Sequence, residues 1–286
     1  MSSTKELRRP HWLKVDLAGK GSFYQVKELV AGHQLHTVCQ SARCPNIGEC
    51  WGRKTATFMI LGDICSRNCG FCAVLHGRLQ PPDPDEPARV AAAVQELGLR
   101  YAVVTSVTRD DLPDGGAAHF AATISAIRAR SPRCQVEVLI PDLGGSISAL
   151  AAILAAQPDV LSHNLETVQA LYPRVRPQAD YRRSLTLLAA ARKAGSLTKS
   201  GLMLGLGETR AQLQAALADL RAVDCQLLTL GQYLPPSRHH LPVDRFIEPG
   251  EFAEWQETAI RMGFIHVESA PLVRSSYRAD RQSTHA

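Results

Sequence analysis

The chain has 286 residues, of which 45% are hydrophobic, and its 32 Lys and Arg against 27 Asp and Glu give a formal net charge of +5 at pH 7. This length fits one large α/β domain or two ordinary ones, and the hydrophobic share argues against a disordered chain. No apolar run approaches the ~18 residues of a membrane span, and the N-terminus lacks a signal-peptide pattern, so we expect a cytoplasmic protein without a membrane partner.

The first 38 residues carry scattered hydrophobic side chains, among them Trp12, Phe23 and Val30. Their spacing does not predict one strong helix, yet the segment is too apolar for a free tail. We therefore expect a short arm that packs on the main body.

A first group of three cysteines follows at Cys39, Cys44 and Cys50, and the intervening Pro45 and Gly48 predict a loop. The chain has eight cysteines and no export signal, which indicates a reducing compartment, where clustered thiols are more often metal ligands than disulfides. Buried single cysteines have no reason to recur at metal-ligand spacing. This first cysteine group therefore predicts a metal centre.

A second cysteine group lies within the eight residues Cys65-Ser-Arg-Asn-Cys69-Gly-Phe-Cys72. A loop residue extends the chain by at most ~3.6 Å, so this spacing lets the loop wrap one face of a compact metal centre. Four-thiolate sites close their coordination, whereas three ligands leave one metal position open, which indicates catalysis. The alternative is a zinc knuckle whose fourth ligand lies elsewhere in the chain.

The rest of the chain alternates short apolar runs with Ala-rich amphipathic helices. Strands are predicted at 57–61, 101–107, 135–140, 160–164, 201–205 and 227–234. Helices are predicted at 87–97, 117–130, 147–156, 179–194, 209–223 and 251–262, and Thr209 with Gln212 predicts a capping box. Six strand-helix units indicate an α/β protein with a partial (β/α) barrel, in which function collects at the C-terminal ends of the strands.

Two cysteine spacings carry a resemblance to known families. Cys-x3-Cys-x2-Cys ahead of a (β/α) chain resembles the radical S-adenosylmethionine (SAM) superfamily, and Cys-x4-Cys-x5-Cys before it is similar to the lipoyl synthase family. Residues 105–117, 163–167, 172–177 and 274–277 also resemble signatures of that family. The resemblance runs from Cys39 to Tyr277, nearly the whole chain.

The resemblance implies a partial (β/α)6 barrel of the radical SAM type over residues 55–263. An N-terminal extension over 1–54 would carry the auxiliary cluster motif, and a C-terminal extension over 264–286 would carry an Arg-Ser-Ser-Tyr motif. It also implies a sulfurtransferase that inserts two sulfur atoms at C6 and C8 of a protein-bound octanoyl-lysine.

The implied cofactors are two [4Fe-4S] clusters and SAM. Cys65, Cys69 and Cys72 would hold the catalytic cluster, whose open iron binds SAM. The auxiliary cluster would donate the sulfur, and its implied ligands are Cys39, Cys44, Cys50 and the alkoxide of Ser275. Ser276 is the second choice for that alkoxide.

Contacts to SAM are expected at strand ends. Residues 201–208 resemble the strand that lines the adenine in the superfamily, with Met203 and Gly205 in this stretch, and Phe71 stands where relatives place an apolar residue near the adenine. A Gly-Gly-Glu stretch that many relatives use for the methionyl amine is missing after the second strand, where Thr105 and Ser106 stand. The polar residues suited to the ribose and the carboxylate are Asn164, Glu166, Arg174, Arg176 and Lys199.

Each of these residues also has a purely structural explanation. Residues 201–208 would form a tight turn, Phe71 would be a core residue, and the polar side chains would lie on the surface. Cys134 and Cys225 are predicted to be core thiols, and His239 with His240 is predicted to lie in a solvated loop.

The resemblance implies three kinds of partner and no nucleic acid. They are an octanoylated lipoyl carrier domain or protein, a low-potential electron donor such as ferredoxin or flavodoxin, and iron-sulfur assembly proteins. The basic net charge suits an acidic carrier.

Two other functions remain open from the residues. A two-cluster methylthiotransferase acting on tRNA would also suit the basic charge, although its relatives have a different N-terminal cysteine spacing and an added RNA-binding domain. An iron-sulfur electron carrier or sensor would need neither the barrel nor an open iron.

Overall fold

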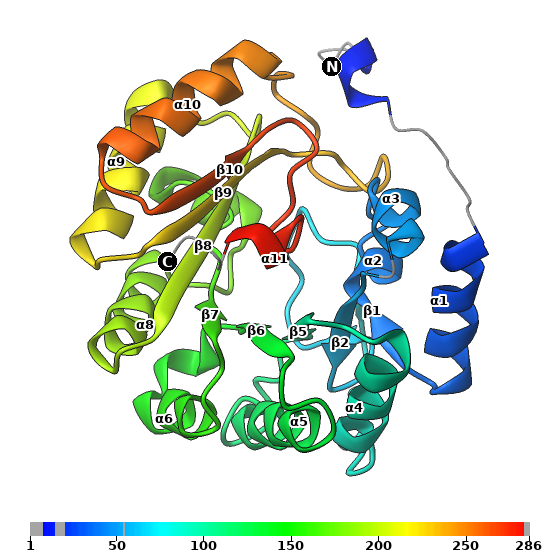
Figure 1. Ribbon diagram of the computed structural model, residues 1–286. Coiled ribbons are helices and arrows are strands. Elements are labelled where there is room, and N and C mark those ends of the chain that lie inside the picture. Colours follow the sequence, from blue (N-terminus) through cyan, green and yellow to red (C-terminus); the bar gives the residue numbers. More distant parts are fainter. Residues whose placement is uncertain (1–7, 15–20, 54, 283–286) are drawn as a thin grey trace.

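The computed structural model describes residues 8–14, 21–53 and 55–282. Its main element is an eight-stranded sheet with the strand order β1-β2-β5-β6-β7-β8-β9-β10. The pair of β1 and β2 is antiparallel, and all other neighbours in this sheet are parallel. Figure 1 shows the strands as an arc with helices outside it. In the described residues β1 and β10 are the two edges and do not pair, so the predicted partial barrel is confirmed.

The strands of this sheet are β1 (His36–Thr37), β2 (Thr57–Ile60), β5 (Tyr101–Ser106), β6 (Gln135–Leu139), β7 (Val160–Ser162), β8 (Leu197–Leu204), β9 (Leu227–Gln232) and β10 (His266–Ser269). A separate two-stranded sheet consists of β3 (Ile64–Cys65) and β4 (Leu75–His76). The longer helices are α1 (Gly21–Gly32), α4 (Glu86–Leu97), α5 (Ala117–Arg130), α6 (Ile147–Ala155), α8 (Tyr181–Lys193), α9 (Arg210–Ala222) and α10 (Pro249–Arg261). The short helices are η1 (His11–Leu13), α2 (Val38–Ser41), α3 (Ile47–Gly52), η2 (Leu143–Gly145), η3 (Gln169–Leu171), α7 (Tyr172–Val175) and α11 (Ala279–Gln282).

All six predicted strands and all six predicted helices are present, as β2, β5 to β9, and α4, α5, α6, α8, α9 and α10. The capping box at Thr209 and Gln212 is confirmed. One strand starts earlier than predicted, since β8 begins at Leu197 rather than at Gly201. Its first residues include Thr198, Lys199 and Ser200. They are buried but polar, so hydropathy does not predict a buried strand there.

The expected packing of the N-terminal arm on the main body is confirmed for residues 21–32, but two other expectations for the N-terminal part were wrong. Residues 21–32 form helix α1, which buries Val26 and Val30 one turn apart against the core. The segment from Cys39 to Cys50 is not a plain loop, because Cys39 lies on α2 and Cys50 on α3. Helix α2 forms where Thr37 caps it, with Thr37 Oγ1 accepting a hydrogen bond from Gln40 N at 3.3 Å.

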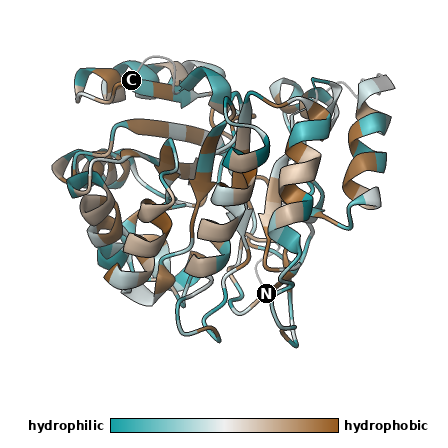
Figure 2. Ribbon diagram, turned by 60° about the horizontal axis from the view of Figure 1, so that its bottom comes forward, coloured by the Kyte–Doolittle hydropathy of each residue, from teal (hydrophilic) through white to brown (hydrophobic). Residues whose placement is uncertain are grey.

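Hydrophobic cores lie between the outer face of the sheet and the helices. Phe120, Ile124 and Ile127 of α5 are fully buried at helical spacing, and each such side chain contributes about 1.5–3 kcal/mol of transfer free energy. Figure 2 shows hydrophobic residues along the strands and hydrophilic residues at the periphery. Cys134 and Cys225 are buried, so the prediction of two core thiols is confirmed. None of the described helices is long and apolar enough to cross a bilayer.

The inner face of the sheet carries a polar layer instead of an apolar one. Lys199 Nζ donates to both carboxylate oxygens of Glu137, at 3.0 and 3.2 Å. The hydroxyls of Tyr101 and Ser162 donate to the same carboxylate at 2.7 and 2.8 Å. Four adjacent strands, β5 to β8, are thus cross-linked through Glu137, and its buried charge is balanced by Lys199.

The C-terminal segment enters the arc from β10. Helix α11 lies in the middle of the arc in Figure 1, and its Ala279 packs against Tyr101 and Val103 of β5. The segment also passes close to β9, because a Cβ on Gly231 would stand 2.1 Å from Val273 O. Strand β10 and this segment belong to the expected C-terminal extension, and β1 belongs to the N-terminal one. Residues 1–7, 15–20, 54 and 283–286 of these extensions lie outside the described ranges.

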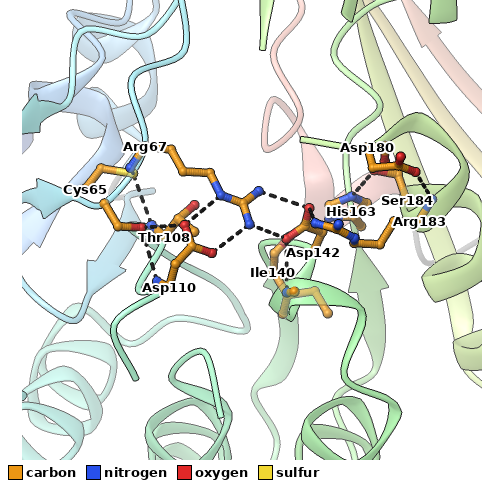
Figure 3. A network of polar contacts seen from close by, with 12 residues as sticks. Cys65, Arg67, Thr108, Asp110, Ile140, Asp142, His163, Asp180, Arg183 and Ser184 are labelled. Carbon is orange, nitrogen blue, oxygen red and sulfur yellow. Dashed lines mark hydrogen bonds and ion pairs between the residues drawn. The ribbon is translucent and has the colours of Figure 1, made fainter. Parts of the chain in front are cut away.

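A neutral histidine lies just after β7. His163 Nδ1 is 2.8 Å from Ile140 O and must donate to it, so Nε2, 2.9 Å from Ser184 Oγ, is the unprotonated nitrogen (Figure 3). Burial lowers the pKa of His163 to about 4, and the positive charge of Arg176 acts in the same direction.

We expect this histidine to make the metal-free protein sensitive to mild acid. The unfolded chain takes up the His163 proton near pH 6.5 and the folded chain only near pH 4, so the stability is lost as the pH falls through this window. The expected loss is about 3 kcal/mol in the free energy of unfolding. Urea titrations between pH 7 and pH 4 measure it. A His163→Asn variant should have a flatter pH profile, and an unchanged profile in that variant would contradict the assignment.

Candidate functional site

The second cysteine group lies on a loop bracketed by β3 and β4. Cys65 ends β3, and its Sγ accepts hydrogen bonds from Arg67 N at 3.4 Å and Thr108 N at 3.3 Å. Gly70 N donates to Val175 O at 2.9 Å, which ties the loop to the end of α7. The loop is thus held by segments that follow two different barrel strands, β5 and β7.

The thiols of the second cysteine group influence one another. The pKa of Cys69 is raised to about 11. Burial is the main cause, Cys65 adds to the rise, and the positive charge of Arg176 opposes it. Burial also raises the pKa of Cys72 to about 12, with Cys69 and Cys65 adding to the rise. Adjacent buried thiols resist ionisation unless a cationic centre binds them, which is the electrostatic condition of a metal site.

The first cysteine group has the same property. Burial raises the pKa of Cys50 to about 12, and Cys39 and Cys44 contribute to the rise. Burial raises the pKa of Cys39 and of Cys44 as well. The structure thus brings these three side chains into mutual electrostatic reach, although they come from α2, α3 and the turn between them.

The C-terminal segment packs against the first cysteine group. Asn46 Nδ2 donates to Leu272 O at 2.7 Å, and Tyr277 OH is 3.1 Å from a carboxylate oxygen of Glu49. The positive charge of Arg274 lowers the pKa of Cys44 against the effect of burial. The Arg-Ser-Ser-Tyr motif therefore lies beside the first cysteine group, as its predicted role requires.

The two serines of this motif differ in their contacts. Ser276 Oγ accepts a hydrogen bond from Thr57 Oγ1 at 2.8 Å, so it is engaged with β2. Within the described part of the chain, the Ser275 hydroxyl has no hydrogen-bond partner. Of the two, Ser275 is the one whose oxygen is free for a ligand.

Glu166 and Arg274 link the two cysteine groups electrostatically. The carboxylate of Glu166 acts on Cys69 and Cys72, and Arg274 acts on Cys44 and on Glu166. Burial raises the pKa of Glu166, against the opposing effect of Arg176. Glu166 also has a φ of +66°, a left-handed conformation that is uncommon for a glutamate and is enriched at functional sites.

Several buried polar atoms at the end of β5 and in the segment after β7 have no hydrogen-bond partner in the described residues. Asn164 Nδ2 donates to Glu166 at 3.0 Å, and Arg176 Nη1 donates to Asn164 O at 2.8 Å. In the described residues, Asn164 Oδ1, Arg176 Nε and Ser106 Oγ are buried without a hydrogen bond. Buried polar groups are nearly always paired, so these atoms fit a polar ligand such as the ribose and methionyl groups of a nucleoside cosubstrate.

The apolar residues expected near an adenine are also brought together. Phe71 and Met203 both pack against the cluster of Val175, Leu206 and Tyr233. Gly205 has a φ of +95°, and a Cβ there would stand 2.4 Å from Arg245 O, so this position requires glycine.

Three of the predicted polar residues are engaged within the protein. Thr105 Oγ1 donates to Leu139 O at 2.8 Å, and Arg174 Nη2 donates to Leu206 O. Lys199 lies four residues before Met203 on β8, roughly 13 Å deeper along the strand, and its ammonium is paired with Glu137.

Sequence reasoning missed two supports of the second cysteine group. His240 was expected in a solvated loop, but its Nε2 is 3.0 Å from Cys72 O and its Nδ1 is 2.9 Å from Ser237 Oγ. His240 and Cys72 are 168 residues apart, so no local pattern reveals the contact. The other support is Arg67, which binds Asp110 and Asp142. Its position between Cys65 and Cys69 was the one sign in the sequence that it could serve this group.

The donor sets fit iron-sulfur clusters. Each group offers three thiols, the usual ligands of such clusters. No three His, Cys, Asp or Glu side chains in the described residues converge closely enough to hold a single metal ion. A four-iron cluster is wider than one ion and needs ligands that stand farther apart.

The fold and this site define a radical SAM enzyme, since a model of the Radical SAM superfamily matches residues 59–220, more than half of the chain. A solved methylornithine synthase superposes with a TM-score of 0.55 over 87% of this chain and 72% of its own, and at 12% identity this likeness concerns the fold alone. The lipoyl synthase of Symbiobacterium thermophilum is 57% identical over 98% of this chain and 88% of its own length. That of Rubrobacter xylanophilus is 55% identical over 97% and 87%. The chain therefore belongs to the lipoyl synthase family.

Proposed function

We propose that the protein forms the lipoyl group by inserting sulfur at C6 and C8 of an octanoyl chain carried on a lysine of a lipoyl carrier domain. The observation that carries this proposal is the presence of two three-cysteine groups, linked through Glu166 and Arg274 at one end of the barrel. One group alone would serve SAM cleavage. The second group supplies a place for the sulfur source.

Cys65, Cys69 and Cys72 hold the catalytic [4Fe-4S] cluster in this proposal and leave one iron position for SAM. When bound, the cluster and SAM supply hydrogen abstraction from unactivated C–H bonds. The protein holds the reacting groups in place and excludes water from them. Val175, Leu206 and Tyr233, which back Phe71 and Met203, are almost fully buried, as exclusion of water requires.

The protein's own residues orient SAM. Phe71, Met203 and Gly205 line the adenine, and Asn164 Oδ1 and Arg176 Nε, which lack protein partners in the described residues, bind the ribose and the methionyl group. Ser106 Oγ is a further donor at the end of β5. Glu166 orients Asn164, whose Nδ2 donates to it, and Thr105 donates to Leu139 O next to Ser106.

The auxiliary cluster is a substrate in this scheme, because its sulfides end in the product. Cys39, Cys44 and Cys50 hold it together with the Ser275 alkoxide. A serine oxygen is a harder and less usual ligand for iron than a thiolate, so it is released more easily when the cluster opens. Arg274 places a positive charge next to this group and favours the ionised form of Cys44.

The proposed reaction needs three kinds of partner in the cytoplasm. An octanoylated carrier brings the acyl chain, a low-potential donor such as ferredoxin or flavodoxin brings electrons, and iron-sulfur assembly proteins restore the consumed cluster. The net charge of +5 favours an acidic carrier domain.

Anaerobic reconstitution tests the function. We expect about eight iron and eight sulfide per chain, as two four-iron clusters require. With SAM and a reductant, the protein should convert an octanoylated carrier domain into its lipoyl form, which mass spectrometry detects. Transfer RNA is the matched alternative substrate. A modified tRNA together with an unchanged carrier would overturn the proposal, and reduced protein that leaves SAM intact would indicate an electron carrier.

A further inference from the structure

Arg67 lies in the middle of the second cysteine group, two residues after Cys65 and two before Cys69, and is only 8% exposed. Its guanidinium binds two carboxylates at once (Figure 3). Nε and Nη2 donate to Asp110 at 2.8 and 2.7 Å, and Nη1 and Nη2 donate to Asp142 at 3.0 and 2.7 Å. Two-pronged contacts of this kind fix a guanidinium in position and in orientation.

The two carboxylates come from loops that follow neighbouring barrel strands. Asp110 follows β5, and Asp142 follows β6 at the start of η2. Asp142 is fully buried and also accepts a hydrogen bond from Arg183 of α8 at 3.3 Å. The two arginines and two aspartates balance in charge, and burial of Asp142 is offset by Arg67, which lowers the pKa of this carboxyl to about 2.

The same contacts bring the β5 loop against Cys65. Ser66 N donates to Thr108 O at 3.0 Å, and Ser66 Oγ is 2.8 Å from Asp110 Oδ2. Thr108 N and Arg67 N are the two donors to Cys65 Sγ. One of these amides belongs to Arg67 itself, and the other lies two residues before Asp110.

We propose that Arg67 is a positioning residue that, through Asp110 and Asp142, holds the Arg67 and Thr108 amides on Cys65 Sγ and so sets the reduction potential of the cluster bound there. This inference rests on the proposed cluster at the second cysteine group. Hydrogen bonds to a cluster sulfur stabilise the extra negative charge of the reduced form, so they raise the reduction potential. Without the guanidinium, Asp110 and Asp142 lose the group that joins them, and only Arg183 remains beside Asp142.

The test compares Arg67→Gln and Asp142→Asn with a control, Arg128→Gln. The control removes an Arg–Asp pair, Arg128 to Asp159 at 2.9 Å, next to the N-terminal end of β7 and thus at the other end of the barrel. Reconstituted full chains are titrated with reductant, and the cluster is followed by the EPR signal that changes when SAM is added.

We expect Arg67→Gln and Asp142→Asn to move the potential to more negative values. At a fixed potential the ratio of reduced to oxidised cluster should fall about tenfold, which corresponds to about 59 mV for a one-electron couple. Arg67→Lys keeps the positive charge but cannot form the bidentate contacts of the guanidinium, so it should give an intermediate shift of the reduction potential. In the metal-free protein, hydrogen exchange of the Arg67 and Thr108 amides should accelerate in Arg67→Gln and not in the control.

An unchanged potential in Arg67→Gln, with a loss of stability like that of the control, would overturn the proposal. If Arg67→Gln and Asp142→Asn do not fold, Asp110→Asn is the deciding variant. It keeps the buried pair of Arg67 with Asp142 and weakens only the contacts of Asp110 with Arg67 and Ser66. An unchanged potential in Asp110→Asn then overturns it. A wild-type chain without a SAM-sensitive signal would instead refute the proposed function.

Discussion

Replacing Cys39, Cys44 and Cys50 together by alanine is expected to abolish lipoyl formation and to preserve reductive cleavage of SAM. The supports of the two cysteine groups are separate, since the first contacts Asn46, Glu49 and the C-terminal segment, and the second contacts the segments after β5 and β7. The two groups share no hydrogen-bond partner, and Glu166 and Arg274, which link them electrostatically, are unchanged in this variant, so the effects should be nearly independent. Cleavage should therefore stay within about threefold of the wild type. Chromatography of 5′-deoxyadenosine and mass spectrometry of the carrier measure the two activities.

The reverse triple variant, at Cys65, Cys69 and Cys72, is the control. It should lose both activities, because SAM then has no iron to bind. If the first triple variant still formed the lipoyl group, the cluster at that group would not be the sulfur source.

Ser275→Ala is expected to keep SAM cleavage and to lower lipoyl formation by more than about 100-fold, beyond the 10–100-fold typical of an outer-shell change. The reason is that Ser275 follows Arg274, whose charge acts on Cys44, and that its hydroxyl has no hydrogen-bond partner in the described residues. Ser275→Cys should retain the auxiliary cluster and slow the transfer of sulfur, because a thiolate leaves iron less easily than an alkoxide.

Ser276→Ala is the matched control. It removes the hydrogen bond from Thr57, which contributes about 1 kcal/mol to stability, and should leave sulfur insertion intact. Iron content and lipoyl formation of the two alanine variants, compared side by side, decide between the serines. Full lipoyl formation by Ser275→Ala would show that another group completes the site.

The sequence predicted what local spacing encodes. Three cysteines within eight residues must lie on one short loop, and apolar runs followed by amphipathic helices must give parallel strands with helices outside. Helix α1 was missed because the apolar residues before it obscured its helical spacing, and its helical form depends on Val26 and Val30 packing against the core.

The contacts that complete the site could not be predicted from the residues, because they join distant parts of the chain. Arg67 and Asp142 are 75 residues apart, and Thr57 and Ser276 are 219 apart. Such pairs meet only after the strands take their places in the arc. Lys199 was expected near a strand end as a ligand contact, whereas the fold places it inside β8 and pairs it with Glu137. The role of Ser275 came from family resemblance alone.

The contact between Asn46 and Leu272 spans 226 residues and determines when the first cysteine group can be completed during synthesis. The three cysteines of this group are translated early. The C-terminal segment that packs beside them, with Arg274 and Tyr277, is translated last. Until then Cys39, Cys44 and Cys50 belong to a nascent chain without the C-terminal segment that packs beside them. We therefore expect the first cysteine group to be completed late in synthesis, because a chain that ends before position 272 lacks the contacts of Asn46 with Leu272 and of Glu49 with Tyr277.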